Sequence, residues 1–449
     1  MRISTDERAS DYSLLTTKAI DDIVGRGLAA NFWDNAHKPR LYKNLLRRLQ
    51  QSCYLGPGPD YKALSSRQRL LAEYEKDGLV LFLGAGVSIG SGIPNWVTLS
   101  QRILGRAGLA VPPSDRPPIE ELLERFDRVY AKLNDRREFT RLLYECLYQC
   151  VEAKALLEDF PRKRSELLTP ASREKLRQLL CALRKNSTLT AVGELLIDQE
   201  TKKNGWRRNP RIHAVLTVNT DNLVELYCQA RTSGHRLLTM VDRSSVGDHP
   251  NAIPVYHLHG TLDARGEHCS RPECDYWMSD YSLLPDLVFI TSEYKRTIAN
   301  SASFVNHTPQ SYLQRLNVLF IGTSLDDPNI CRWLKTSYEE RLQHRTKYLR
   351  EYYRGKYNHA EREAEWESIR HFWLRKPEND EDRREIECEK RKLGVQVVWC
   401  EDHGLECLSA LKKEGVGDDF GRQAHGQSGR WFEFLRSTHD SLGCWCATY

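Results

Sequence analysis

The chain has 449 residues, of which 40% are hydrophobic and 28% charged, so one to three domains with apolar cores are expected. Its 66 basic and 61 acidic residues leave a net charge of +5, which gives no argument for a nucleic-acid partner. The sequence has no run near the ~18 apolar residues of a membrane helix, and its N-terminal residues are too charged for a signal peptide. Thirteen cysteines without repeated spacing are typical of reduced thiols. We therefore expect a cytoplasmic protein that contacts neither membrane nor nucleic acid.

The pattern of apolar residues divides the chain into three parts. Residues 1–75 carry leucines at helical spacing and predict an N-terminal helical extension. Residues 76–415 predict one large domain, which begins with the apolar run LVLFL. Within it, residues from about 112 to 204 have apolar side chains at helical spacing and predict a helical insertion, because structureless loops of that length are rare. Residues 416–449 are expected to form a C-terminal tail.

Further apolar runs in the large domain predict the strands of its sheet. These runs are HAVLTVN at 213–219, IPVYHLHG at 253–260, NVLFIGTS at 317–324, HFWLRK and VQVVWC. They do not alternate between apolar and polar residues, and helical segments separate them, as in strands buried on both faces. The expected fold class is therefore α/β, a Rossmann-like, doubly wound and mostly parallel sheet. Residues 335–394 mix basic and aromatic with acidic residues, which favours a solvated helix face over a nucleic-acid surface.

The first strand is followed directly by small residues. Gly84, Ala85, Gly86 and Ser88 come after LVLFL. Small residues let a backbone approach a phosphate closely, and the N-terminus of a following helix would supply N–H donors. The stretch lacks the usual G-x-G-x-x-G spacing and an acidic residue about 20 positions later. By itself it is therefore equally compatible with a structural turn.

Polar residues also stand at the ends of two later strands. Thr217, Asn219 and Asp221 end the run at 213–219, at the edge where an open parallel sheet binds ligands, although such residues are also common in turns. His257 and His259 are two positions apart in HLHG, so on one strand they would point to the same face. A histidine at a strand end is more often structural than catalytic, but one followed by glycine in a polar crevice is a better candidate.

The fourth stretch, NVLFIGTSLDDPNICRWL, reads as a strand, a Gly-Thr-Ser turn and a helix. Asp326 or Asp327 would cap that helix and Pro328 would occupy its first position. Four such stretches in this order indicate a ligand site far more specifically than any one of them does.

Together the four stretches resemble the sirtuin-like family of NAD-consuming proteins. GAGVSIGSGIP is similar to that family's first glycine-rich NAD loop, TVNTD to its Thr-x-Asn-x-Asp motif, HLHG to its catalytic His-Gly, and GTS to its later ribose loop. Trp96 after IPN, the DDPNICRWL helix and the run KLGVQVVWC resemble the bacterial-type branch, many of whose members are antiviral NAD hydrolases. The resemblance covers residues from about 78 to 412.

The resemblance implies NAD as the substrate and assigns roles to the residues of the four stretches. His259 would be the general base, with Asn219 and Asp221 at the nicotinamide ribose. The residues implied in binding NAD are Gly84, Ala85, Gly86 and Ser88 at the pyrophosphate, Gly322, Thr323 and Ser324 at the adenosine ribose, and Thr217. The chemistry is consistent with these roles, because one base and a polar group beside the ribose suffice for an oxocarbenium-like transition state.

Two departures from the family argue against protein deacylation. Deacetylating sirtuins follow the proline of the first loop with Asp/Glu-Phe-Arg, whereas NW stands here. They also hold zinc with two cysteine pairs, whereas this chain offers His268, Cys269 and Cys274 without a second close pair, so no metal site is expected.

The leading hypothesis is an NAD glycohydrolase that releases nicotinamide and linear or cyclic ADP-ribose and depletes NAD as a defence effector. An NAD-dependent protein deacylase and a non-catalytic scaffold or sensor that binds NAD or ADP-ribose remain alternatives. The N-terminal extension would hold protomers in a homo-oligomer, or hold the enzyme inactive until an activating protein or ligand binds.

Overall fold

The chain divides into two units, Ser66–Phe420 and a second formed by Met1–Ser65 with Gly421–Tyr449. The computed structural model describes residues 65–112, 117–160, 169–197, 211–232, 238–241, 252–265, 287–300, 302–352, 368–377, 380–401 and 404–414. The proposed N-terminal extension lies almost wholly outside these residues, and so does the C-terminal tail.

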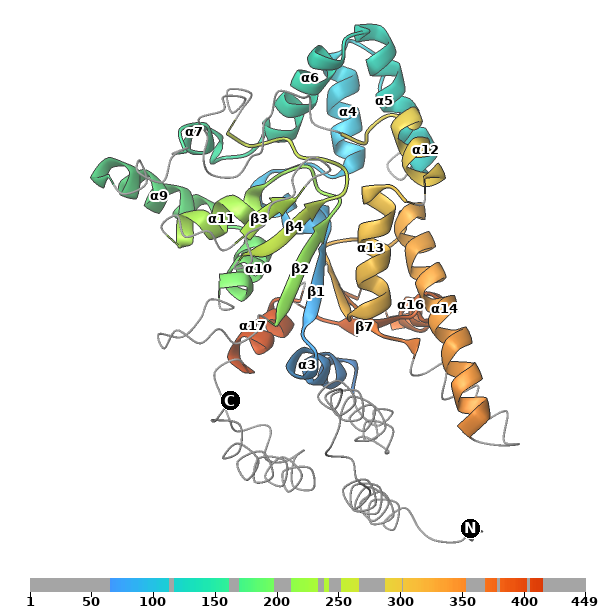
Figure 1. The fold of residues 1–449 in the computed structure, drawn as a ribbon. Helices are drawn as coiled ribbons and strands as arrows, with labels where there is room; N and C mark the ends of the chain where they lie inside the picture. Colours follow the sequence, from blue (N-terminus) through green and yellow to red (C-terminus); the bar gives the residue numbers. More distant parts are fainter. Residues whose placement is uncertain are drawn as a thin grey trace, which may run out of the picture. The chain divides into compact units, whose positions relative to one another are not determined.

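Parallel strands form the centre of the unit Ser66–Phe420 (Figure 1). The strands are β1 (Leu79–Leu83), β2 (Ile212–Thr217), β3 (Leu238–Val241), β4 (Ile253–His257), β5 (Val318–Ile321), β6 (His371–Arg375) and β7 (Val395–Trp399). Among the described residues they make one seven-stranded sheet in the order β3-β4-β2-β1-β5-β6-β7, and every neighbouring pair is parallel. The predicted fold class is confirmed, although β3 was not predicted.

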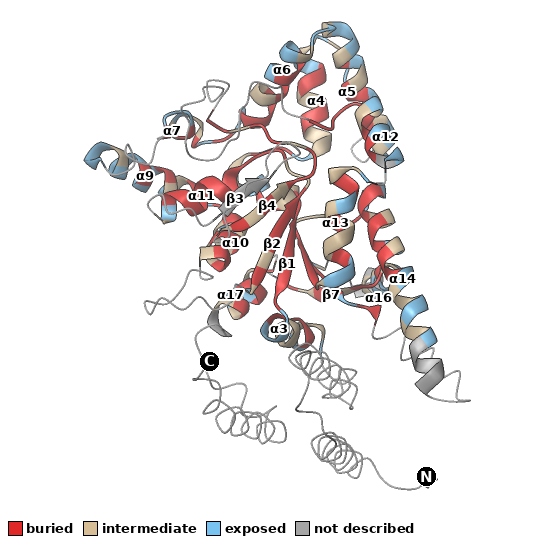
Figure 2. Ribbon diagram, in the orientation of Figure 1, coloured by how far each residue is buried: buried red, intermediate tan, exposed pale blue. Residues whose placement is uncertain are grey.

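Helices cover both faces of this sheet, as the absence of alternation in its strands predicts (Figure 2). On β1, Leu79, Leu81 and Leu83 point to one face, and Val80 and Phe82 to the other. The first face packs against α10 (Ser187–Ile197), α11 (Leu223–Arg231) and α17 (Leu405–Glu414), and the second against α13 (Phe304–Arg315) and α14 (Pro328–Tyr352). Each fully buried leucine contributes about 1.5–3 kcal/mol to this core.

The helix before β1 belongs to the same unit. Helix α3 (Ser66–Lys76) buries Leu70 and Tyr74 in the core, and Arg69 donates a hydrogen bond from Nη1 to Oε1 of Gln396 on β7 (3.2 Å). The unit therefore begins about ten residues earlier than the boundary expected after residue 75.

The described part of the expected insertion at 112–204 is helical. It contains α5 (Ile119–Leu133), α6 (Arg136–Tyr148), α7 (Lys154–Glu158), α9 (Pro170–Leu183) and α10. Asp135 caps α6, because its side chain accepts the N–H of Arg137 (2.7 Å). Helices α5 and α6 gather with α4 (Trp96–Arg106) and α12 (Thr291–Ala299) beyond the carboxyl ends of the strands (Figure 1). Of the described helices, none is both long and apolar enough to cross a membrane.

The strand order brings the four polar stretches together. Strand β1 lies between β2 and β5, so the chain builds the sheet to one side of β1 first and then to the other. Open α/β sheets bind ligands at the carboxyl ends of the strands beside such a switch point. The carboxyl ends of β1, β2, β4 and β5 adjoin at this edge, and each carries one of the predicted stretches.

Candidate functional site

The glycine-rich stretch after β1 folds as two tight turns. They are 3-10 turns at Ala85–Val87 and Ile89–Ser91, and the first regular helix, α4, begins only at Trp96. These turns therefore separate the N-terminus of the following helix from Gly84 and Gly86. The tight turns bring the stretch across the end of β1 instead.

These turns lie against the loop that follows β5. The N–H of Gly84 donates to the carbonyl of Ile321 (2.9 Å), and the N–H of Gly86 donates to that of Gly322 (2.8 Å). A Cβ at Gly84 would meet Cα of Thr323 at 2.8 Å, and one at Gly86 would meet Cα of Gly322 at 2.7 Å. Gly322 itself has a φ of +68°, which favours glycine. The glycines thus allow two loops to pack closely, and two of their N–H groups bind protein rather than a phosphate.

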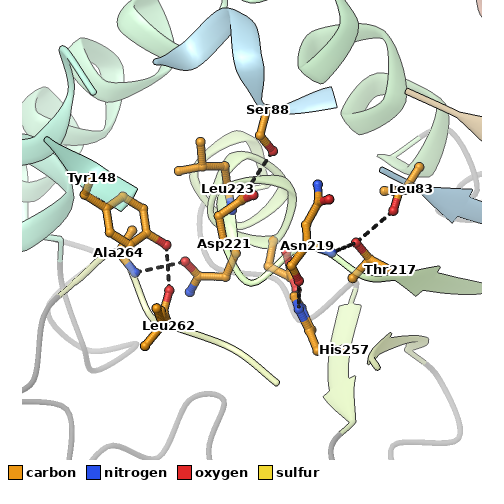
Figure 3. Close-up of polar contacts among 12 residues, drawn as sticks. Leu83, Ser88, Tyr148, Thr217, Asn219, Asp221, Leu223, His257, Leu262 and Ala264 are labelled. Atoms are coloured by element: carbon orange, nitrogen blue, oxygen red, sulfur yellow. Dashed lines mark hydrogen bonds and ion pairs between the residues drawn. The ribbon is translucent and has the colours of Figure 1, made fainter. Parts of the chain in front are cut away.

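Asn219 is fixed at the end of β2. Its main-chain N–H donates to Oγ1 of Thr217 (2.9 Å), and that hydroxyl donates to the carbonyl of Leu83 on β1 (3.0 Å). Figure 3 shows these two bonds, and the side-chain Nδ2 of Asn219 donates in addition to the carbonyl of Gly84 (3.0 Å). The predicted ribose-binding amide therefore lies across the start of the glycine-rich turns.

Asp221 links the glycine-rich turns to helix α11. Its Oδ1 accepts the hydroxyl of Ser88 (2.8 Å) and the N–H of Leu223 (3.2 Å) (Figure 3). Burial raises the pKa of Asp221 to about 6, against the opposing effect of these hydrogen bonds. The structure thus gives Ser88 and Asp221 each other as partners, at the place where the resemblance implies pyrophosphate and ribose.

The two histidines of HLHG occupy different environments. Strand β4 ends at His257, so the expectation that His257 and His259 share one strand and one face is wrong. His257 places Nε2 2.5 Å from Oε1 of Glu225 on α11, and Nδ1 3.1 Å from the carbonyl oxygen of Asn219. Burial opposes a charge on His257, but Glu225 and the Asn219 carbonyl outweigh it and raise the pKa of His257.

His259 lies in an aromatic pocket. Its ring meets those of Trp96 (5.8 Å between centroids) and Tyr294 (6.4 Å) edge to face, and the residue is 1% exposed. Neither ring nitrogen has a hydrogen-bond partner among the described residues. Burial lowers the pKa of His259 below its usual 6.5, and Asp327 only partly opposes this. The imidazole is therefore neutral at neutral pH and keeps a basic nitrogen for a ligand.

Helix α6 of the insertion holds the loop that carries His259. The hydroxyl of Tyr148 donates to the carbonyl of Leu262 (2.6 Å; Figure 3), and that of Tyr144 donates to the carbonyl of Ala264 (3.2 Å). These bonds satisfy two main-chain carbonyls of a loop that lies outside the strands. The insertion thus forms part of the site.

The predicted adenosine-ribose loop follows β5. The indole Nε1 of Trp373 donates to the carbonyl of Thr323 (2.8 Å), and the Thr323 hydroxyl accepts the N–H of Leu325 (3.3 Å). Ser324 is exposed, so its hydroxyl is accessible to a ligand. Gly322 packs on the glycine-rich turns, which places the loop next to Asn219 and Gly84.

Asp327 caps helix α14. Its Oδ1 accepts the N–H of Asn329 (2.8 Å), whereas Asp326 lies 3.3 Å from Nζ of Lys390. Of the two predicted caps, Asp327 is confirmed, and Pro328 occupies the first helical position as expected. The hydroxyl of Tyr294 also donates to Asp327 (3.2 Å), which joins this cap to the pocket of His259.

Residues 213–374 match the SIR2-like domain. This match supports the sirtuin-like family that the motifs predict. It runs from β2 to β6 and includes Asn219, His259 and the Gly-Thr-Ser loop, while the glycine-rich turns precede it. No curated protein matches the chain.

Two buried polar residues, Glu225 and Asn186, contact the predicted stretches but were not predicted themselves. Glu225, at 3% exposure, interrupts the otherwise apolar helix start LVELYC, which indicates a buried partner but does not identify it. Asn186, from the insertion, donates its Nδ2 to the carbonyl of Val87 (2.8 Å) and so supports the glycine-rich turns. Its distance along the chain from those turns leaves no local signal in the sequence.

The residues that were considered as metal ligands lie in another part of the chain. His268, Cys269 and Cys274 lie outside the described residues. Within the part that is described, His, Cys, Asp and Glu form no group suited to a metal ion.

Proposed function

We propose that the protein is an NAD glycohydrolase that cleaves NAD to nicotinamide and ADP-ribose. The observation that carries the proposal is His259, a buried neutral imidazole with no hydrogen-bond partner for either nitrogen among the described residues. It follows β4, and β4 pairs with β2, which leads to Asn219. The SIR2-like match over both residues supports NAD as the substrate.

The chemistry needs few groups. As the bond from the ribose to nicotinamide breaks, its electron pair returns to the pyridinium ring and positive charge develops on the ribose. The amide of Asn219 would orient that ribose. A water attacks the anomeric carbon and gives its proton to His259, which is competent because its imidazole is neutral. Attack by an adenine nitrogen instead of water would give the cyclic product.

The resemblance to the bacterial-type branch supports a broader proposal. In it, cleavage depletes NAD in the cytoplasm as a defence response. A homo-oligomer or an activating partner, acting through residues 1–75, would control the enzyme.

The test is nicotinamide release from NAD by the purified chain. We expect release by the wild type, with ADP-ribose as the second product. His259→Ala and Asn219→Ala should each reduce the rate by about 100-fold or more, the usual contribution of a general base or a charge-stabilising group. His307→Ala is the matched control, since His307 is exposed on α13 and should leave the rate unchanged. Tight binding of NAD without release, in the presence and absence of candidate activators, would contradict the proposal and favour a sensor.

A further inference from the structure

The Glu225–His257 pair is a buried dyad that no assigned role uses. The side chains are 4% and 1% exposed, and Oε1 of Glu225 lies 2.5 Å from Nε2 of His257. The dyad joins two elements, α11 and β4, and its second ring nitrogen points at Asn219 (Figure 3). Buried ion pairs are often no better for stability than apolar residues of the same volume. Stability therefore does not explain the Glu225–His257 pair, and its geometry indicates another role.

The geometry fixes the protonation of the ring. Nδ1 of His257 lies 3.1 Å from a main-chain carbonyl, which can only accept, so Nδ1 must carry a proton. The remaining nitrogen and the Glu225 carboxylate then share one further proton across 2.5 Å. Whichever of the two atoms holds it, the ring donates to the carbonyl of Asn219. Glu225 thus keeps the ring in one orientation, with Nδ1 as the donor to the carbonyl of Asn219.

This donor completes the restraint of Asn219. The main-chain N–H of Asn219 is held by Thr217, and its side-chain amide by the carbonyl of Gly84. The carbonyl of Asn219 is held by His257, so the residue is fixed at three points, which come from β2, the turn after β1, and β4. Freeing the carbonyl would let the peptide rotate and carry the side-chain amide away from Gly84.

We propose that His257 and Glu225 are positioning residues, which act through the main-chain carbonyl of Asn219 to hold its side chain where NAD cleavage requires it. The inference rests on the proposed function, because Asn219 matters only if the site acts on NAD. His257 would not touch the substrate, so its loss should lower kcat and leave the binding of NAD unchanged.

A matched pair of variants separates this role from a structural one. His257→Asn places an amide N–H near the position of Nδ1 and can still donate to the Asn219 carbonyl, whereas His257→Leu fills the space without a donor. Both variants remove the imidazole that contacts Glu225, so the cost of burying the unpaired Glu225 carboxyl is the same in each. We expect His257→Leu to lower kcat for nicotinamide release by about tenfold, the effect of one buried hydrogen bond, and His257→Asn to lose less than threefold. Equal kcat values in the two variants, at equal thermal stability, would overturn the proposal.

A double variant tests whether the effect passes through Asn219. Residues that act through one another are not additive, so Asn219→Ala with His257→Leu should be no slower than Asn219→Ala alone. A further tenfold loss in the double variant would show that His257 acts independently of Asn219.

A spectroscopic measurement distinguishes failure of this inference from failure of the proposed function. In the full chain labelled with ¹⁵N-histidine, we expect a slowly exchanging ring N–H signal that His257→Leu abolishes. If the wild type shows that signal but releases no nicotinamide, the proposed function fails and the dyad stands as geometry. If the signal is absent, the dyad fails whatever the rate of cleavage.

Discussion

At the scale of single residues, Asp221 is a site residue whose buried carboxylate lowers the stability of the fold at neutral pH. It is 5% exposed, and burial raises its pKa from 3.8 to about 6. Folding therefore favours the protonated carboxyl. The stability that this preference contributes is complete below about pH 4, declines as the pH rises from about 4 to 6, and is absent above that window. At neutral pH the buried carboxyl is ionised, and its hydrogen bond from Ser88 offsets only part of the desolvation penalty.

Replacing the Asp221 carboxyl with a neutral amide should show how much the buried charge destabilises the fold. Asp221→Asn keeps an oxygen that can accept from Ser88 and from the N–H of Leu223, but it removes the charge. We expect it to raise the free energy of unfolding at pH 7.5 by roughly 1–3 kcal/mol, with the gain vanishing towards pH 4. Thermal unfolding across this pH range measures the effect. A difference from wild type that is the same at pH 4 and pH 7.5 would show that the buried charge is not its cause.

The residue scale also shows what the sequence cannot supply. Asn219 and His259 could be selected because each ends a predicted strand. The bond between Glu225 and His257 joins residues 32 positions apart, and no local pattern encodes which of two neighbouring histidines it involves. The wrong assignment of a shared face arose because the alternation of a strand was extended beyond His257, where β4 ends.

At the scale of elements, the site depends on the close approach of the turns after β1 and the loop after β5. Gly84 donates a main-chain hydrogen bond to the last residue of β5 and Gly86 donates one to the loop that follows, and neither position has room for a Cβ. The sequence indicated a phosphate-binding loop because glycines follow a strand. The structure adds that these glycines also serve packing between neighbouring strand ends, which depends on strand order and is not visible in a local motif.

Substituting Gly86 tests this packing. In Gly86→Ala the new Cβ would meet main-chain atoms of Gly322 at 2.7 and 2.9 Å, so the two loops must separate. We expect a loss of about 1–3 kcal/mol in stability and weaker binding of NAD. Gly105→Ala is the control, because a Cβ there meets nothing within 4 Å, and alanine in the exposed turn of α4 should stabilise slightly. Unchanged NAD affinity in Gly86→Ala would show that the approach of the loops does not shape the site. Binding titrations and thermal unfolding supply both readouts.

At the scale of the whole molecule, long apolar runs made the sheet predictable. Six of its strands are contiguous apolar segments between helical ones, and their lack of alternation indicated cover on both faces. The four residues of β3 are too few to show a period, and they were missed. The predicted start of the large domain was about ten residues too late. The sequence of α3 is mostly charged, and it did not indicate that Leu70 and Tyr74 join the core.

The central claim is that a neutral His259 at the carboxyl edge of the sheet drives the cleavage of NAD. The pH profile of kcat/KM for nicotinamide release by the wild type tests it most directly, since it reports the essential groups of the free enzyme. Burial holds the pKa of His259 below 6.5 and raises that of Asp221 to about 6, so both groups lose their protons before neutral pH. We predict that kcat/KM rises as the pH increases to about 6.5 and is level from there to pH 8. A rate that is highest near pH 5 and falls towards pH 8 would require a protonated imidazole, and would contradict the account.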